Sequence, residues 1–364
     1  PILLLLTHSC YASPNSDLPL LRLGAIQSLT GVGAPDGENV ARGIRLAVEE
    51  INSTGKKVEL FLEDDLTAPH SALGAYQALK RRQVDAVIGA TWAFVTDALI
   101  PRAARDGLVL LNTTVIPEGL RLDLGRGYAF ANYIPVAAET RPCSDFLEER
   151  GVKRLGVVYN RTPWAFVQAE MYRKRAMESG YEVVEYIETL DVENNSMREL
   201  IPRLVAKRVD GIVLIVANND TDLFLRRAAE LKLAIPICSS KNTPYSFEDT
   251  TQKAAYRGVC FGYPVQRLSS EQSFYRKFTK RFGEPPRIYA DNSYDAAFLI
   301  YKAFKESKAL GISLKDAIRQ IRHRGVNTDY FFSPVSSLAR GSSTLVCMQQ
   351  LPGGEIGAEY TRRQ

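Results

Sequence analysis

The sequence is poor in the residues that most often mark a catalytic or metal site. It has three histidines and five cysteines among 364 residues. No HExxH or CxxC spacing occurs, so neither a zinc site nor a thioredoxin-type motif is readable. The histidines also lie outside any nucleophile-elbow pattern, which lowers the expectation of an enzyme although a triad could still assemble in space. We therefore expect no catalysis, no metal and no cofactor.

Long hydrophobic runs are missing as well. No uninterrupted apolar stretch approaches the roughly 20 residues that cross a bilayer. Residues 1–6 form a short apolar run before a loop-like segment, which is typical of the end of an export signal; a frayed chain end is the alternative. Cleavage before Cys10 would leave a lipid-carrying cysteine, and cleavage after Ala12 is equally defensible. We expect residues 1–20 to be a signal remnant and linker, and the protein to be periplasmic or extracytoplasmic with Cys10 as a candidate lipid anchor.

Charge of one sign is not in large excess. Lys and Arg number 46 against 41 Asp and Glu, a formal net charge of +5. The basic clusters are scattered within helical patterns, where solvated helix faces explain them. We expect no nucleic-acid partner.

The few cysteines leave their pairing open. Five are too few for a disulfide framework in a chain of this length. Cys238 and Cys260 fall on two predicted strands. They could form a disulfide, and two buried free thiols are the equal alternative.

The sequence does contain a regular alternation of strand-like and helix-like segments, which starts at Leu21. Such alternation predicts βαβ units with parallel sheets, and the chain length suits two domains. After Pro135 the alternation starts again. The predicted strands are 21–26, 58–62, 84–89 and 108–111 in the first half, and 154–159, 181–187, 211–216 and 235–238 in the second.

Two segments echo each other across the halves. Residues 80–88 and 207–213 each place a basic helix end and an aspartate before a buried strand. The echo is short enough to be coincidence, but it fits two lobes that are built alike.

The last hundred residues have no parallel sheet of their own. Helical patterns cover 270–282, 292–307 and 314–324, and strand-like segments cover 329–334 and 343–349. We therefore expect the tail to complete both earlier lobes, with the chain crossing near Ile134, Pro264 and Phe332. The predicted division is 21–133 with 265–330 for the N-terminal lobe, and 134–264 with 331–364 for the C-terminal lobe.

Ligands of open α/β sheets collect at the carboxyl ends of the strands, so the residues just after each strand are the candidate site. The only two tryptophans fall there, one per lobe, and could clamp a flat or apolar ligand or simply pack on their own lobe. Two adjacent threonines could bind a carboxylate or cap a helix. The candidate ligand-binding residues are Asp36, Trp92, Ala93, Phe94, Thr113, Thr114, Trp164, Asn218 and Lys241.

A glycine-rich turn precedes the first predicted helix. Gly31, Gly33 and Gly37 miss the GxGxxG spacing by one residue, and no GxxxxGK[ST] motif exists. A plain glycine-rich loop is favoured over a phosphate or dinucleotide site.

Several motifs together carry a family resemblance over about residues 21–351. They are Ser28-Leu29-Thr30-Gly31, the helical segment 43–52, Leu62-Glu63-Asp64-Asp65, the strand 84–89 and Ser293-Tyr294-Asp295-Ala296. In this order the chain resembles type I periplasmic solute-binding proteins, in the leucine/isoleucine/valine-binding branch that serves ABC transporters. The resemblance implies an α/β fold of two Rossmann-like lobes with parallel central sheets, joined by a three-stranded hinge. It also implies a monomer that closes on a small-molecule ligand and delivers it to a membrane permease.

The resemblance assigns roles to individual positions. The first carboxylate-binding loop falls on Trp92 to Phe94, where Ala93 replaces the usual hydroxyl residue, and the second falls on Thr113 and Thr114. An aromatic contact falls on Trp164, where Tyr is usual. Another falls near Ala217 or Asn218, where no aromatic remains.

The largest departure from the family is Lys241. Amino-acid binders place an acidic side chain in this loop to pair with the ligand ammonium, and a lysine would repel that group. A register error of several residues would remove the argument, because Glu248 and Asp249 follow. Otherwise a simple α-amino acid is an unsuitable ligand. Asp36 could then supply a substitute acid, or Lys241 could receive a second carboxylate.

These observations predict a solute-binding protein for a small polar ligand that bears a carboxylate or an aromatic ring. Two other functions stay open. The same fold could serve as the sensing domain of a receptor or regulator, and a nucleotide-using α/β enzyme is the third alternative. Neither an output domain nor a membrane span is visible in the sequence.

Overall fold

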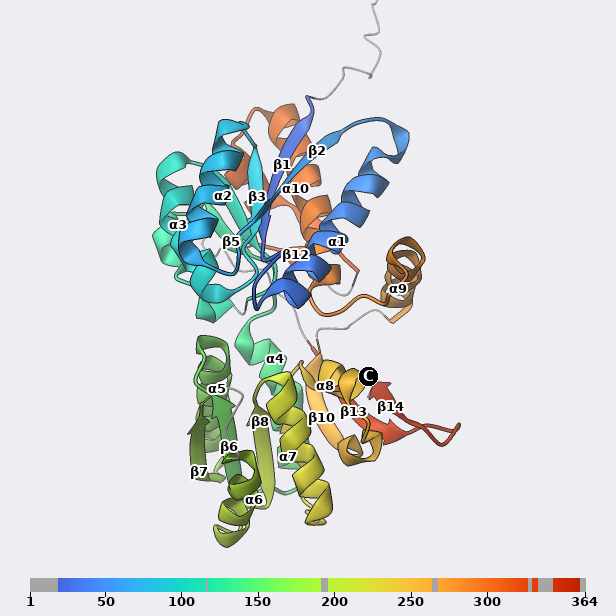
Figure 1. Cartoon of the computed structure of the whole chain (residues 1–364). Helices are drawn as coiled ribbons and strands as arrows, with labels where there is room; N and C mark the ends of the chain where they lie inside the picture. The colour runs from blue at the N-terminus through green and yellow to red at the C-terminus, as the bar shows by residue number, and fades with distance from the viewer. Residues whose placement is uncertain are drawn as a thin grey trace, which may run out of the picture.

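A computed structural model describes residues 19–115, 117–190, 196–263, 268–326, 329–332 and 343–360. It contains two α/β lobes stacked end to end, each with a central sheet and helices on both faces (Figure 1). The expected fold class is therefore confirmed. The signal remnant with Cys10 and the crossing at Pro264 lie outside the described residues. The lobe boundaries and the three-stranded hinge stay predictions.

The first sheet is entirely parallel, in the order β2-β1-β3-β4-β5. Alternate residues of its strands enter two hydrophobic clusters, one on each face, as expected for strands covered on both sides. Helix α1 covers one face, and α2 and α3 cover the other. The elements are β1 (Leu21–Gln27), α1 (Ala34–Ile51), β2 (Val58–Asp64), α2 (Pro69–Arg81), β3 (Ala86–Gly89), α3 (Ala93–Asp106), β4 (Val109–Asn112) and β5 (Ala129–Ala131), with short 3-10 turns at Asn52–Thr54, Pro117–Gly119 and Leu122–Gly125.

Helices from the tail pack on this first sheet. Helix α9 (Leu268–Phe282), α10 (Ala290–Leu310) and α11 (Leu314–Gln320) bury apolar side chains in the same cluster as α1. In Figure 1 the orange α10 lies directly behind the blue strands β1 and β2.

The predicted helix 314–324 is too long at its C-terminal end. Ile321 has an extended ψ of 143°, and its side chain is buried. Beyond it, β11 (Arg322–Arg324) pairs antiparallel with β12 (Asp329–Phe331). The buried carboxylate of Asp295 accepts the N–H of Val326 at 2.8 Å, which fixes the return of the chain. Tertiary contacts thus override the helical periodicity here.

The second sheet has seven strands in the order β14-β13-β10-β9-β8-β6-β7. The five strands from β10 to β7 in this order are parallel, and the C-terminal β13 and β14 add antiparallel pairs at the edge opposite β7. Helices α4 and α5 cover one face, and α6 and α7 cover the other. The elements are α4 (Val136–Glu149), β6 (Arg154–Asn160), α5 (Pro163–Ser179), β7 (Glu182–Thr189), α6 (Ser196–Ala206), β8 (Gly211–Ile215), α7 (Asn218–Glu230), β9 (Ile237–Ser239), α8 (Thr243–Asp249), a 3-10 turn at Lys253–Tyr256, β10 (Val259–Tyr263), β13 (Thr344–Gln350) and β14 (Ile356–Tyr360).

The sequence echo between the halves corresponds to one repeated local structure. In the first lobe Asp85 accepts the backbone N–H of Arg22, and the Arg22 Nε donates to the carbonyl of Arg82. In the second lobe Asp210 and the carbonyl of Arg208 do the same for Arg154. Each aspartate ties the start of one strand to the loop before its neighbour, so the two lobes begin their sheets in the same way.

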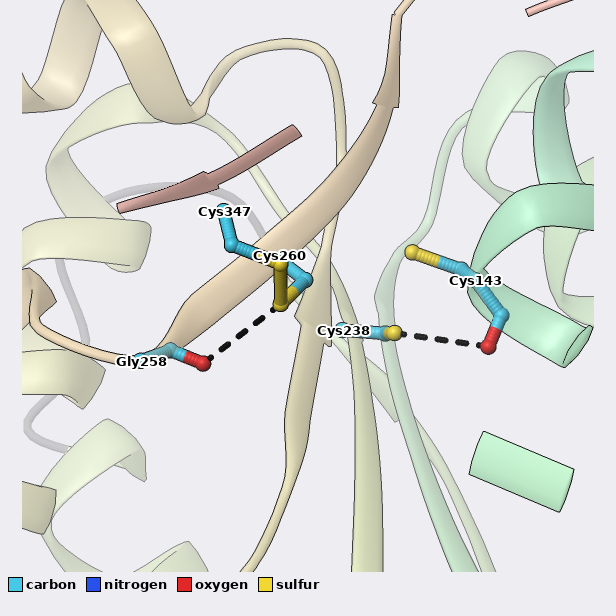
Figure 2. Close-up of a disulfide and its surroundings, with 5 residues drawn as sticks. All are labelled: Cys143, Cys238, Gly258, Cys260 and Cys347. Carbon is cyan, nitrogen blue, oxygen red and sulfur yellow. Dashed lines mark hydrogen bonds between the residues drawn. A yellow bond between two sulfur atoms is a disulfide. The ribbon is translucent and has the colours of Figure 1, made fainter. Parts of the chain in front are cut away.

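Of the two alternatives that the sequence leaves open, neither is found in full, because Cys238 is a free thiol and Cys260 is not. Cys260 is bonded to Cys347 instead, with an S–S distance of 2.09 Å. These two residues face each other across the antiparallel pair β10–β13, whereas Cys238 is the parallel neighbour of Cys260 on β9. Figure 2 shows the disulfide beside Cys143 and Cys238, which are buried free thiols. The Cys238 thiol donates to the Cys143 carbonyl oxygen at 3.6 Å.

No helix within the described ranges is long and apolar enough to cross a membrane.

Candidate functional site

Residues from both lobes meet around one buried lysine. Lys241 follows β9 of the second lobe and is 4% exposed. Its Nζ lies 4.2 Å from the ring centroid of Tyr133, which follows β5, and 4.7 Å from that of Tyr289, which precedes α10. Glu139 on α4 and Asp36 on α1 act on it through their charge. We call Asp36, Tyr133, Glu139, Lys241 and Tyr289 the Lys241 cluster.

The two tyrosine rings form an aromatic corner against the ammonium. Their centroids are 5.8 Å apart at an interplanar angle of 67°. Tyr289 has a φ of +74°, a left-handed conformation that bulky L residues rarely adopt and that is concentrated at functional sites. Tyr133 is fully buried, and its hydroxyl interacts with the carboxylate of Glu139.

The acids of the cluster are both strongly desolvated. Burial raises the pKa of Glu139, which is 3% exposed, and Glu118 adds to this effect while Lys241 opposes it. The Tyr133 hydroxyl also interacts with the Glu139 carboxylate and lowers its pKa. Burial also raises the pKa of Asp36, against the opposing effects of Trp92, Lys241 and Arg287. For Lys241, burial lowers the pKa, and Glu139 and Asp36 oppose that shift.

Trp92 and Asp36, both predicted site residues, are in direct contact. The indole Nε1 of Trp92 donates to Asp36 Oδ2 at 3.2 Å. Trp92 is the N-cap of α3 and packs partly against its own lobe. The backbone N–H groups of Ala93 and Phe94 in the first turn of α3 donate to no acceptor in the described structure. Free N–H groups at a helix N-terminus are suited to a carboxylate.

The two threonines after β4 differ in a way the sequence does not reveal. The Thr114 hydroxyl donates to the Thr91 carbonyl at 2.5 Å, and its N–H donates to Asn112 Oδ1 at 3.1 Å. The Thr113 hydroxyl is buried and has no partner in the part of the chain that the structure describes. Thr114 therefore holds the loop, and Thr113 is the better candidate for a ligand contact.

Valine at each threonine position separates these roles. Thr114→Val should destabilise the protein by about 1–3 kcal/mol, because it leaves a buried carbonyl unpaired. Thr113→Val should change unfolding free energy by less than about 0.5 kcal/mol, while it weakens the tightest-binding carboxylate by about tenfold. Urea unfolding and titration calorimetry measure both effects. Equal loss of stability in the two variants would refute the assignment.

The remaining predicted residues are less informative. Trp164 lies in the first turn of α5 and packs partly against the second-lobe core, so the expectation that it faces Trp92 across a ligand stays a prediction. Phe94 is half exposed and lies 6.0 Å from the Trp92 ring. Asn218 begins α7.

The glycine turn and its acidic partners have structural roles. A Cβ at Gly37 would lie 2.0 Å from the carbonyl oxygen of Ser28, so α1 packs directly on the preceding loop. Asp64 accepts the N–H of Leu29, and Asp65 accepts the Ser28 hydroxyl. These contacts support the interpretation of a plain glycine-rich loop.

One surface hollow lies apart from the Lys241 cluster. A surface hollow of about 500 Å³ is lined by residues of α5 and the start of β7, including Arg173 and Met177. It is at the amino end of β7, opposite the strand ends where ligands of such sheets bind.

In the described ranges no three His, Cys, Asp or Glu side chains are grouped to hold a metal ion.

Three cluster residues were missed by sequence reasoning. Tyr133 and Glu139 flank the predicted crossing at Ile134, and Tyr289 precedes the predicted helix at Asn292. The predicted crossing near Ile134 could have pointed to Tyr133 and Glu139, because segments that join two lobes also border the space between them. Nothing local marks Tyr289, because only the tertiary fold brings it to Lys241.

Two α/β lobes with polar residues converging from both sheets define the architecture of a bilobal ligand-binding protein. The family profile described as periplasmic binding protein matches residues 21–350. The chain belongs to this periplasmic binding protein family, as the sequence motifs predict.

Solved structures of similar fold cover nearly the whole chain. A substrate-binding protein of an ABC transporter from Sphaerobacter thermophilus has a TM-score of 0.81 at 20% identity, covering 95% of this chain and 98% of its own. LivJ from Streptococcus pneumoniae, in complex with isoleucine, has a TM-score of 0.76 at 19% identity, with 95% and 100% coverage. A solute-binding protein from Rhodopseudomonas palustris BisB5, in complex with 3,4-dihydroxy benzoic acid, has a TM-score of 0.81 at 18% identity, with 94% and 96% coverage. Among curated proteins no sequence matches.

Proposed function

We propose that this chain is the extracytoplasmic solute-binding protein of an ABC transporter. It captures a small ligand that bears a carboxylate or an aromatic ring, and its lobes close over that ligand by hinge motion. The loaded protein then docks on a membrane permease as a monomer, without catalysis. Family membership supports the binding role, and the ligand follows from the chemistry of the Lys241 cluster and the adjacent loops.

One observation carries the proposal: buried polar atoms without partners gather at the strand ends that face the other lobe. They belong to Thr113 after β4, Asn132 after β5 and Ser239 at the end of β9. Buried polar groups are rarely left unpaired in folded proteins. A polar ligand in this place would satisfy several of them at once.

The proposed contacts divide the ligand between the lobes. The Thr113 hydroxyl and the free N–H groups of Ala93 and Phe94 donate hydrogen bonds to one polar end of it. Trp92 and Trp164 stack on its flat or apolar part, and Lys241 pairs with an anionic group. Similar folds accept both an aliphatic amino acid and a hydroxylated benzoate, so the fold leaves the ligand class to these side chains.

Trp164→Ala tests the binding mode. We expect ligand affinity to fall by about tenfold or more, because an aromatic contact of this kind contributes on the order of 1–2 kcal/mol. The measurement is titration calorimetry, with tryptophan fluorescence as a second signal, against a panel of small carboxylates.

Met177→Ala is the matched control, because Met177 is 69% exposed near the other end of the same helix. It should leave affinity unchanged. Unchanged affinity in Trp164→Ala would disprove the tryptophan clamp, and absence of binding by the wild-type protein to every carboxylate would disprove the proposed ligand class.

A further inference from the structure

The ammonium of Lys241 occupies the kind of site that proteins build for a cationic ligand. Its Nζ lies over the faces of two tyrosines, at 4.2 Å and 4.7 Å from the ring centroids. A cation over aromatic faces is attracted by the ring quadrupole, most strongly where water is excluded. The carboxylates of Glu139 and Asp36 add the negative charge that such a site needs. The aromatic corner therefore already holds a cation from the chain itself.

Both carboxylates of the Lys241 cluster already have a basic group of the chain beside them. Asp36 receives the Trp92 indole N–H and is influenced by the charges of Lys241 and Arg287. Glu139 is influenced by Lys241. Lys241 is thus a positive group that both carboxylates of the cluster already have beside them when a ligand approaches.

Lys241 also keeps its hydrogen-bonding capacity. An ammonium has three N–H donors, and the contacts of the Lys241 ammonium are those with the rings of Tyr133 and Tyr289 described above. Cation–π contacts with the two tyrosine rings do not replace hydrogen bonds to the N–H donors of this ammonium. An incoming carboxylate would accept a charge-assisted hydrogen bond from it.

We propose, on the basis of the proposed function above, that Lys241 is a built-in substitute for a ligand ammonium, so that the ligand is a carboxylic acid without an α-amino group. The ligand class comprises aromatic acids and 2-oxo acids. An α-amino acid would place a second positive charge beside Lys241, and like charges at such short range repel strongly in a desolvated site.

Matched ligand pairs test this in the wild-type protein. Leucine is compared with 4-methyl-2-oxopentanoate, and phenylalanine with phenylpyruvate, with benzoate as an aromatic acid without a side chain. We expect at least one of the amine-free acids to bind more than about tenfold tighter than its amino partner, because repulsion acts on the amino partner alone. Titration calorimetry measures each dissociation constant.

Lys241→Met keeps the length of the side chain and removes its charge. It should weaken the amine-free acids by about tenfold or more. Lys315→Met is the matched control, because the Lys315 Nζ lies 4.6 Å from the ring centroid of Tyr128, which precedes β5, whereas Tyr133 of the Lys241 cluster follows the other end of that strand. This control should retain wild-type affinity, and thermal melting checks that both variants fold.

The possible results distinguish failure of the amine-free ligand class from failure of solute binding itself. If an amino acid binds as tightly as its amine-free partner, or if Lys241→Met keeps full affinity for the acids, the inference is overturned and solute binding stands. If neither series binds the wild-type protein, both the inference and the proposed ligand class fail. Selective binding of the amine-free acids that depends on Lys241 supports the inference.

Discussion

Gly43→Val is expected to be among the most destabilising substitutions in the chain. Helix α1 packs against α10 at this glycine, and a Cβ there would lie 2.2 Å from the carbonyl oxygen of Ala290 and 2.3 Å from the Ser293 hydroxyl. The nearest atom belongs to helix backbone, which cannot turn aside as a flexible side chain can. Overpacking of this kind costs about 3 kcal/mol or more, which is a large share of the stability of an ordinary domain.

Gly74 provides the control for this prediction. It lies in α2, and a Cβ there would meet nothing within 4 Å. Gly74→Ala should therefore stabilise the protein by up to about 1 kcal/mol through helix propensity, whereas Gly43→Ala should already destabilise it. Urea unfolding followed by circular dichroism measures both. Similar shifts in the two alanine variants would show that α1 and α10 are not in close backbone contact.

Loss of the Cys260–Cys347 disulfide should lower the unfolding free energy by about 2–4 kcal/mol. The two cysteines are 87 residues apart, so the bond restricts a long loop of the unfolded chain. It also fastens the C-terminal strand β13 to β10. The double variant Cys260→Ser with Cys347→Ser removes both sulfurs, and thermal melting measures the loss.

A reducing agent gives the matched comparison. It should lower the melting temperature of the wild-type protein and leave that of the double variant unchanged. Peptide mapping without reduction should recover Cys260 joined to Cys347. Recovery of Cys260 joined to Cys238 would instead support one of the alternatives left open by the sequence and contradict the strand pairing at this edge.

Much of the fold is predictable from the sequence because its strands are buried on both faces. Strands such as 84–89 and 211–216 then appear as short apolar runs between helices of regular period. The failures have a common cause. The disulfide partner of Cys260 and the end of the helix at Gln320 depend on antiparallel pairs between distant segments, which local periodicity does not encode.

The candidate site is predictable only in part for a similar reason. Ligands of open α/β sheets bind beyond the carboxyl ends of the strands, and this rule predicts Asp36, Trp92 and Lys241 as candidates. Their partners Tyr133 and Tyr289 come from segments that are far away in the chain. The sequence marks Lys241 as an unusual residue for this position, but only the structure places its ammonium against two tyrosines.

The central claim is that this protein binds a small carboxylate between its lobes. Mass spectrometry of the molecule released on denaturation of the purified protein tests it most directly, with the buffer and a sample of the Trp164→Ala variant as blanks. We expect the released molecule to be a small carboxylic acid without an amino group, which is present in the wild-type sample and depleted in the variant. Release of an α-amino acid or a nucleotide from the wild-type protein would contradict it.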